Sequence, residues 1–259
     1  MRKIFTCIAI IFLAVMIVYG IFFSFDKKDI KQKPAVVSQS SSNQNKAEDS
    51  DHPKNFPNVH STDWNLQLVN SDNAVSDQEI DLEIIQGNLQ LDARIINATQ
   101  KLLEAAEKAN VSLQIISAYR TISYQEQLVQ KEIYQNIAKG MTKAEAEQQT
   151  YRLLSKPGHS EHHLGLAIDV VDQAYYRQYG GQLLPEEVAT SKGAIWLKEN
   201  AANFGFILRY PQGKEKITKI QYEAWHYRYV GEEVAKYLIQ NGLTLEEFHE
   251  KLKQLKMLA

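Results

Sequence analysis

The sequence predicts an α+β domain behind an apolar N-terminal segment, and two observations predict this fold class. Apolar residues recur at helical spacing over some stretches of the chain and alternate at strand spacing over others. These stretches follow one another without a regular strand–helix–strand repeat, which argues against a doubly wound parallel sheet. With 259 residues, 44% of them apolar, the chain is long enough for one globular domain with a sizeable core plus an extension.

The N-terminus starts with a basic Met-Arg-Lys and continues with an apolar segment, residues 4–25, that contains no charged side chain. As a helix this segment would be about 33 Å long, enough to cross the hydrocarbon core of a bilayer. It ends without the small residues that precede a signal-peptidase cleavage site. We therefore expect residues 1–25 to form an uncleaved, single-pass membrane anchor, with a cleaved signal peptide as the alternative.

A polar segment separates this anchor from the domain. Residues 26–54 are rich in Lys, Ser, Gln, Asn and Asp, and such a composition cannot bury enough apolar surface to fold. Aromatic and aliphatic residues return at about residue 56 and continue to the end of the chain. We expect a disordered linker over residues 26–54 and one folded domain over residues 55–259.

The first elements of the domain follow from periodicity. Residues 92–110 place Ile95, Leu102 and Ala106 on one stripe and predict an amphipathic helix, and the apolar residues 111–118 predict a strand. The apolar residues of the last helix recur at helical spacing, so we expect them to pack in the core. The same patterns predict helices over residues 122–138, 143–154, 191–203, 232–240 and 245–255, and strands over residues 164–171, 206–209 and 225–230.

Composition limits the classes of partner and site. The formal net charge is −2, so the chain lacks the broad basic field that attracts nucleic acid, and we expect no nucleic-acid partner. The single cysteine, Cys7, lies in the apolar N-terminal segment, so neither an intrachain disulfide nor a cysteine-rich zinc cluster can form. Any metal would have to be held by histidines and carboxylates.

Three histidines and two aspartates lie within residues 159–172. Residues 164–171 alternate large apolar side chains with smaller ones, as expected for a half-buried strand. Asp169 falls on the face with the two smallest residues, where a carboxylate has open space beside it. Asp172 lies beyond the apolar run and suits a turn or a helix cap. His162 lies just before the strand and can reach the same space as Asp169.

A second cluster, Q-Y-E-A-W-H-Y at residues 221–227, offers Glu223 and His226. Hydrolytic zinc sites commonly use three protein ligands, keep the fourth position for water and have a carboxylate nearby as the base. His162, Asp169 and His226 as ligands, with Glu223 as the base, fill that scheme. The two clusters together predict a hydrolytic zinc site, whereas either cluster alone is weak evidence.

The zinc scheme requires Glu223 and His226 of the second cluster to face the same site. Side chains alternate on a regular strand, which would put Glu223 and His226 on opposite faces. Both can face one site only if the chain bends near Ala224 or the strand begins at Trp225. The remaining polar residues of the first cluster are expected to be hydrogen-bonded or solvated side chains: His159, His163 and Glu161.

Two motifs in these clusters resemble the signatures of a known family. S-E-H-H-L-G-L-A-I-D at residues 160–169 matches S-x-H-x-x-G-x-A-x-D, and E-A-W-H at residues 223–226 matches E-x-W-H, of the VanY-like peptidoglycan carboxypeptidases. That family includes D-alanyl-D-alanine carboxypeptidases and the L,D-carboxypeptidases of the LdcB type. The resemblance covers most of residues 60–231 through further motifs: W-N-L-Q-L-V-N at 64–70, D-A-R-I at 92–95, S-A-Y-R-T at 117–121, P-G-H-S-E-H at 157–162 and G-F-I-L-R-Y-P at 205–211.

The resemblance implies the α+β fold of the Hedgehog/D,D-peptidase type, a small antiparallel sheet flanked by helices. It implies that His162, Asp169 and His226 bind Zn²⁺ and that Glu223 is the catalytic base. Arg120 would point its guanidinium into the site, toward the substrate's terminal region or a developing oxyanion, with a structural ion pair as the alternative. The remaining residues carried over from the family line its substrate pocket: Gln125, Ser160 and Tyr210.

The chain departs from the family pattern at His163 and Leu164, where relatives often carry a polar amide and a threonine. The ligand set is unaffected, and the departure is expected to add a spare imidazole at the rim of the site. The implied activity is the removal of a C-terminal D-alanine from peptidoglycan stem peptides. L,D-carboxypeptidase action on tetrapeptide stems is the alternative within this class.

Two alternatives belong to other classes of protein. One is a non-catalytic module that binds the cell wall, and the other is a structural domain with ordinary surface histidines. The presence of all four residues of the zinc scheme favours the enzyme. We expect a monomer whose partners are stem peptides and the membrane, with the catalytic domain outside the cytoplasm.

Overall fold

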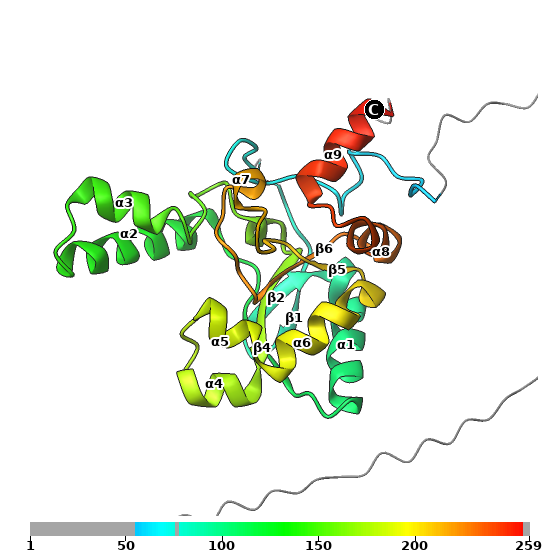
Figure 1. Ribbon diagram of the computed structural model, residues 1–259, viewed down its shortest axis with the longest axis horizontal. Coiled ribbons are helices and arrows are strands. Elements are labelled where there is room, and N and C mark those ends of the chain that lie inside the picture. Colours follow the sequence, from blue (N-terminus) through cyan, green and yellow to red (C-terminus); the bar gives the residue numbers. More distant parts are fainter. Residues whose placement is uncertain (1–54, 76–77, 256–259) are drawn as a thin grey trace, which may run out of the picture. The chain divides into compact units, whose positions relative to one another are not determined.

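The computed structural model describes residues 55–75 and 78–255, and an antiparallel sheet lies at the centre of this part of the chain (Figure 1). The four strands of the sheet are all antiparallel to their neighbours, and a separate hairpin, β1–β2, precedes them. In sheet order the strands are β3 (Leu113–Ser117), β4 (Ala167–Asp172), β6 (His226–Tyr229) and β5 (Phe206–Leu208), and the hairpin is β1 (Leu82–Gln86) and β2 (Leu89–Asp92).

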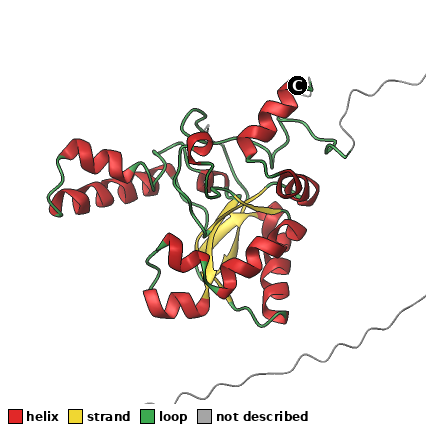
Figure 2. Cartoon of the chain, viewed as in Figure 1, coloured by secondary structure: helices red, strands yellow, loops and turns green. Residues whose placement is uncertain are grey.

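Helices surround the sheet, which confirms the predicted α+β class (Figure 2). Two of them, α2 and α3, lie side by side and project from the rest of the domain (Figure 1). The helices are α1 (Ala93–Lys108), α2 (Ile122–Ala138), α3 (Lys143–Thr150), α4 (Gln173–Tyr179), α5 (Pro185–Ala189), α6 (Lys192–Asn200), α7 (Glu215–Thr218), α8 (Glu232–Asn241) and α9 (Leu245–Gln254), with the 3₁₀ helices η1 (Glu161–Leu164) and η2 (Ala201–Phe204).

The main core lies between one face of the sheet and the helices α1 and α6. Ile168 of β4 packs in the same buried cluster as Ile95 and Leu102 of α1 and Leu197 of α6, and all four side chains are fully buried. The apolar stripe predicted for α1 is therefore its core-facing side. Burial of this apolar surface is the main favourable term that holds the central strand β4 in place.

β4 differs from the strand predicted over residues 164–171. Leu164 belongs to η1, which ends at Gly165 in the left-handed conformation (φ 66°), and the strand begins at Ala167. All six residues of β4 are buried, so the prediction of a half-buried strand was wrong. The second face is covered because Val171 packs in a separate cluster with Tyr175 of α4 and Trp225.

Several short elements lie where no regular structure was predicted, namely the β1–β2 hairpin, α4, α5 and α7. Each contains too few residues for hydrophobic periodicity to show. The start of α4 is nevertheless explained by Asp172, which was predicted to lie in a turn or to cap a helix. Asp172 accepts hydrogen bonds from the backbone N–H groups of Tyr175, at 2.7 Å, and Gly193, at 3.0 Å.

The C-terminal helices α8 and α9 form part of the core, which confirms the prediction made for the last helix. Leu245, Phe248 and Leu252 of α9 are fully buried in one cluster with Leu66 and with Val230, which follows β6. A capping box at the N-terminus of α9, made by Thr244 and Glu247, fixes where the helix begins.

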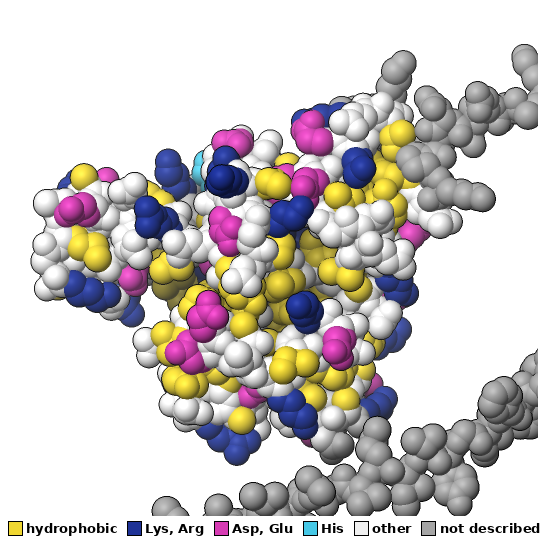
Figure 3. All heavy atoms as spheres, viewed as in Figure 1, with side chains coloured by type: hydrophobic (Ala, Val, Ile, Leu, Met, Phe, Trp, Pro, Cys, Tyr) yellow, Lys and Arg dark blue, Asp and Glu magenta, His cyan; other side chains and the backbone are white. Residues whose placement is uncertain are grey.

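The predicted membrane anchor, residues 1–25, and the linker, residues 26–54, lie outside the described residues. Across residues 55–75 and 78–255, no helix combines the length and apolarity that crossing a bilayer requires. On the face shown in Figure 3, acidic and basic side chains are intermixed over the described residues. This mixed surface agrees with the small net charge of −2.

Candidate metal centre

His162, Asp169 and His226 come together at the middle of the sheet. Asp169 in β4 is paired directly with His226 in the neighbouring strand β6, and His162 reaches the same point from η1. Asp169 Oδ1 lies 3.1 Å from His226 Nδ1, and Asp169 Oδ2 lies 3.3 Å from His162 Nε2. One potential ligand atom from each residue lies within 4.8 Å of the other two, and all three residues are buried.

The backbone around η1 positions His162 and determines which of its two ring nitrogens is available to bind a metal. A Cβ atom on Gly165 would lie 2.8 Å from the backbone nitrogen of Asp92, so this close turn requires glycine. His162 Nδ1 lies 2.7 Å from the carbonyl oxygen of Ala118 and donates its hydrogen there. Nε2 is therefore left with a lone pair that faces Asp169.

Burial and neighbouring charges set the protonation of these three side chains. Burial lowers the pKa of His162 to about 4, which keeps the ring in the neutral form that binds metals. Burial opposes ionisation of Asp169, but His162 and Arg120 outweigh it and hold the pKa of Asp169 well below its usual value. Burial also disfavours charged His226, but hydrogen bonds with Asp169 and Glu161 raise its pKa to about 9.

The other two histidines of the first cluster face elsewhere. His159 Nδ1 lies 2.8 Å from the carbonyl oxygen of Asn70. His163 Nδ1 lies 2.7 Å from the carbonyl oxygen of Arg120, and its Nε2 accepts a hydrogen bond from the N–H of Gly158. The expected spare imidazole at the rim was wrong, because the 5% exposed His163 is a buried link between two loops.

The chain turns just before His226, as is required for Glu223 and His226 to face the same site. β6 begins only at His226, and a turn precedes it in which the N–H of His226 points to the carbonyl oxygen of Glu223 at 3.4 Å. Both side chains consequently face the same site, with Glu223 Oε2 3.8 Å from His226 Nδ1. Burial raises the pKa of the Glu223 carboxyl group to about 8.

Arg120 points its guanidinium group into the site, as the resemblance implied. Its Nη2 donates to Asp169 Oδ2 at 2.5 Å, its Nε to Ser117 Oγ at 2.8 Å and its Nη1 to Gln125 Oε1 at 3.3 Å. Gln125 in turn donates from Nε2 to the carbonyl oxygen of Ser155 at 2.8 Å. Because 12% of the Arg120 side chain is exposed, the guanidinium can also contact a molecule in the cleft.

A cleft of about 480 Å³ opens onto these residues, and residues of the projecting helix α2 line part of it. This volume is large enough for a short peptide segment. The residues predicted from the sequence that line the cleft are Arg120, Gln125, Ser160, His162, Asp169, Tyr210, Glu223 and His226.

The expectation for Glu161 was wrong as well. It was expected to be solvated, but it is 1% exposed and accepts hydrogen bonds from Arg209 and Arg228, each at 2.8 Å. These two guanidinium groups outweigh the effect of burial and lower the pKa of Glu161. The arginines lie 48 and 67 residues away along the chain, so nothing in the local motif signals the pairing.

The donor set of this site fits a zinc ion. Two imidazole nitrogens and one carboxylate oxygen make the three-ligand set of catalytic zinc sites, which leave a position open for water or substrate. Glu223 lies beside this set without belonging to it, where a base is required.

A family model described as VanY: D-alanyl-D-alanine carboxypeptidase matches residues 88–232. The chain belongs to the VanY D-alanyl-D-alanine carboxypeptidase family. This confirms the resemblance carried by the sequence motifs, and the matched residues include all of the predicted site residues that line the cleft. Helix α9 lies beyond the matched residues.

Members of the VanY family and related solved structures are similar over most of the domain. A D-alanyl-D-alanine carboxypeptidase of Enterococcus faecalis is 36% identical over 187 residues, which is 72% of this chain and 66% of that relative, just under two thirds of its length. The zinc complex of a point mutant of the vancomycin-resistance D,D-pentapeptidase VanY is 37% identical, with a TM-score of 0.63, and the match covers 72% of this chain and 99% of that one. The L,D-carboxypeptidase LdcB is 31% identical, with a TM-score of 0.57, and covers 73% of this chain and 87% of that one.

Proposed function

We propose that this member of the VanY family is a zinc-dependent carboxypeptidase that removes the C-terminal D-alanine from peptidoglycan stem peptides. The observation that carries the proposal is the group His162, Asp169 and His226 beside Glu223 in one cleft. The relatives support it, because the 37% identical D,D-pentapeptidase VanY binds zinc and the donor set here fits the same ion.

His162, Asp169 and His226 would hold the zinc through the atoms that face one another, Nε2, a carboxylate oxygen and Nδ1. Zinc held by these ligands supplies a Lewis acid that acidifies water and polarises a carbonyl group. All other steps of the reaction depend on how the chain's own side chains orient the peptide and move protons.

Glu223 is the general base in this proposal. In the described part of the chain, its carboxylate has an ion-pair contact only with His226, at 3.8 Å, so it is not bound into a structural network. Glu223 takes a proton from the attacking water as the new carbon–oxygen bond forms. It then gives the proton to the amide nitrogen as the carbon–nitrogen bond breaks, and the products are the shortened stem peptide and free D-alanine.

Arg120 is proposed to bind the terminal carboxylate of the substrate or the developing oxyanion. Its planar guanidinium is permanently charged and suited to either group. Gln125 helps to fix its direction through the hydrogen bond at 3.3 Å. The competing role for Arg120 is the structural ion pair with Asp169. Ser160 and Tyr210 are proposed to line the substrate pocket.

The relatives favour D,D-carboxypeptidase action over the L,D alternative. Two D,D enzymes are 36% and 37% identical to this chain and LdcB is 31% identical, and the matching family model is itself described as a D-alanyl-D-alanine carboxypeptidase. Mass spectrometry of purified stem peptides after incubation with the zinc-loaded protein tests the choice. We expect pentapeptide stems to lose one D-alanine and tetrapeptide stems to stay intact.

The reverse pattern would identify an L,D-carboxypeptidase. If neither stem loses D-alanine while the protein holds zinc, the catalytic proposal is wrong and the non-catalytic cell-wall-binding module takes its place. Zinc content is measured in the same samples, so that an inactive preparation without metal is recognised.

We also propose that the enzyme is a monomer outside the cytoplasm, with residues 1–25 as a single-pass anchor and residues 26–54 as the linker. The uncharged segment over residues 4–25 supports this placement, as does a substrate that lies outside the cytoplasmic membrane. Proteolysis of intact spheroplasts tests it, and we expect the domain to be digested without lysis. A domain digested only after lysis would contradict this placement.

A further inference from the structure

The two ring nitrogens of His226 face two different carboxylates. Nδ1 lies 3.1 Å from Asp169 Oδ1, on the side of the candidate metal position. Nε2 lies 3.5 Å from Glu161 Oε2, on the opposite side of the ring. The side chain of Glu161 is completely buried and does not line the cleft, so it cannot contact the substrate.

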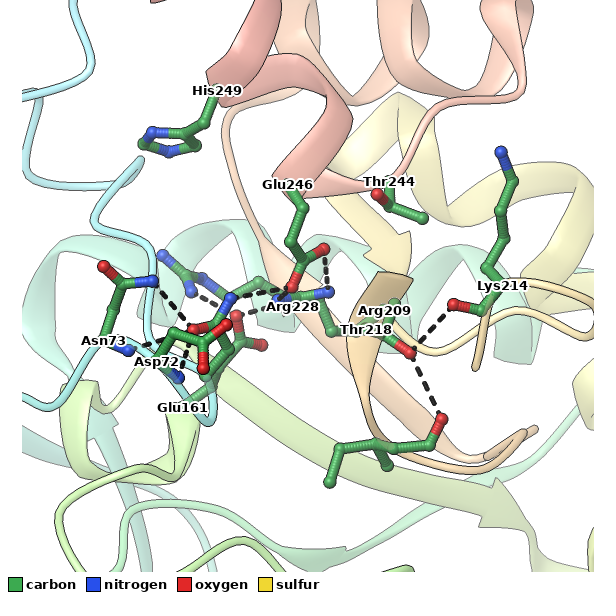
Figure 4. A network of polar contacts seen from close by, with 12 residues as sticks. Asp72, Asn73, Glu161, Arg209, Lys214, Thr218, Arg228, Thr244, Glu246 and His249 are labelled. Carbon is green, nitrogen blue, oxygen red and sulfur yellow. Dashed lines mark hydrogen bonds and ion pairs between the residues drawn. The ribbon is translucent and has the colours of Figure 1, made fainter. Parts of the chain in front are cut away.

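Glu161 is held in place by a buried network of charges (Figure 4). Its Oε1 atom accepts from Arg209 Nε and from Arg228 Nη1, both at 2.8 Å. Arg209 also donates to the two carboxylate oxygens of Glu246, at 2.9 and 2.6 Å, and Figure 4 shows Glu246 reaching this network from α9. Two carboxylates thus balance two guanidinium groups, as buried charges require.

The hydrogen bond at one ring nitrogen decides which nitrogen of a histidine can bind a metal. The oxygen Oε1 of Glu161 is used by the two arginines, which leaves Oε2 to accept a hydrogen from Nε2 of His226. In the neutral ring that binds a metal, Nδ1 then has its lone pair on the side of Asp169. We propose that Glu161 is a positioning residue that holds His226 in the orientation and tautomer in which Nδ1 binds the metal.

This inference rests on the proposed function, because it assigns Glu161 a role toward the same zinc. It also gives the C-terminal helix α9 a part in the site, because Glu246 completes the charge balance around Glu161 and lies outside the residues matched by the family model. The competing explanation is that Glu161 only neutralises the two buried arginines and acts on fold stability alone.

A matched pair of substitutions separates the two explanations. Glu161→Gln and Glu246→Gln each remove one negative charge from the same network, but only Glu161 contacts His226. In Glu161→Gln the amide oxygen stays with the arginines, so the amide NH₂ faces Nε2 of His226. A donor at that place favours the tautomer with hydrogen on Nδ1, which opposes metal binding there.

The test measures zinc affinity by chelator competition in the full-length parent and in both variants. We expect Glu161→Gln to bind zinc about 10–100-fold more weakly than the parent, in line with lost carboxylate partners of metal-binding histidines. We expect Glu246→Gln to lower the melting temperature but to keep the parent affinity. An equal loss of affinity in both variants, or no loss in Glu161→Gln, would overturn the proposal.

If Glu161→Gln does not fold, nitrogen NMR of the zinc-loaded parent tests the hydrogen bond itself without a variant. We expect a hydrogen on Nε2 of His226 that is hydrogen-bonded to the Glu161 carboxylate. A hydrogen on Nδ1, or an Nε2 hydrogen without that hydrogen bond, would overturn the proposal. The parent protein distinguishes failure of the proposed function from failure of this inference. If the proposed function is wrong, the parent itself binds no zinc or releases no D-alanine. If only this inference is wrong, the parent binds zinc and releases D-alanine.

Discussion

Asp169 and His226 face each other across two hydrogen-bonded antiparallel strands, with 3.1 Å between Asp169 Oδ1 and His226 Nδ1. The register of β4 and β6 therefore places two of the three candidate ligands, and a slip of one residue would turn one of them to the opposite face. Only His162 depends on a loop, and its short 3₁₀ helix leads directly toward β4.

Removal of one ligand should empty the site. We expect His226→Ala to lose bound zinc, because two remaining ligands hold the ion too weakly at ordinary zinc concentrations. His159→Ala is the matched control, since His159 contacts the carbonyl oxygen of Asn70 and should keep one equivalent. Metal analysis by mass spectrometry measures both variants. Parent-level zinc in His226→Ala would show that the ligand set is wrong.

Loss of the base should separate metal binding from turnover. Glu223→Gln should retain zinc and lower kcat by about 10²–10⁴-fold, the usual contribution of a positioned acid–base group. Glu126→Gln, at an exposed position of α2 that does not line the cleft, should keep the parent rate. Steady-state release of D-alanine from a pentapeptide stem provides the comparison. Hydrolysis by Glu223→Gln at the parent rate is the outcome that the mechanism does not allow.

The glycine between His162 and β4 should be sensitive to a single methyl group. Gly165→Ala and Gly213→Ala both place a side chain at positive φ, but only Gly165 brings the new Cβ against a backbone atom, Asp92 N, at 2.8 Å. We expect Gly165→Ala to lower the free energy of unfolding by about 1–3 kcal/mol more than Gly213→Ala. Urea denaturation of both variants measures this difference, and equal losses would contradict the argument from close packing.

Acidification should destabilise the domain through His249. Its Nε2 lies 2.7 Å from the carbonyl oxygen of Leu66, and burial, assisted by Arg228, lowers its pKa. Below about pH 6.5 the unfolded chain takes up a proton that the folded chain resists, so the free energy of unfolding falls as the pH falls.

A comparison with His249→Gln isolates this effect, because glutamine keeps a hydrogen-bond donor but does not titrate. Between pH 7 and pH 5 the parent should lose more stability than the variant, by at most about 1.4 kcal/mol per pH unit. Parallel pH profiles of unfolding would show that His249 contributes nothing to acid sensitivity.

The sequence predicted the long elements and the metal-ligand candidates, for identifiable reasons. The helices over residues 93–108 and 122–138 are long enough for periodicity to show, and the α2 prediction has the observed bounds. The candidate ligands lie in two motifs with fixed spacing, and the strand register brings these motifs together.

The rest of the site depends on contacts between distant segments. Glu161 looked like a solvent-exposed acid because its partners, Arg209 and Arg228, come from segments that meet only in the folded chain. His163 looked like a spare imidazole because its contacts are backbone groups, which no side-chain pattern records. The burial of both faces of β4 likewise follows from α4, a helix too short to predict.

The most direct test of the zinc carboxypeptidase is a zinc titration of the full-length protein after metal removal, with release of D-alanine from a pentapeptide stem as the signal. We expect no release from the metal-free protein and a rise that ends at one equivalent of zinc, with the tetrapeptide stem as the other product. Release that does not depend on zinc, or an intact pentapeptide in the presence of the fully loaded protein, would contradict this expectation.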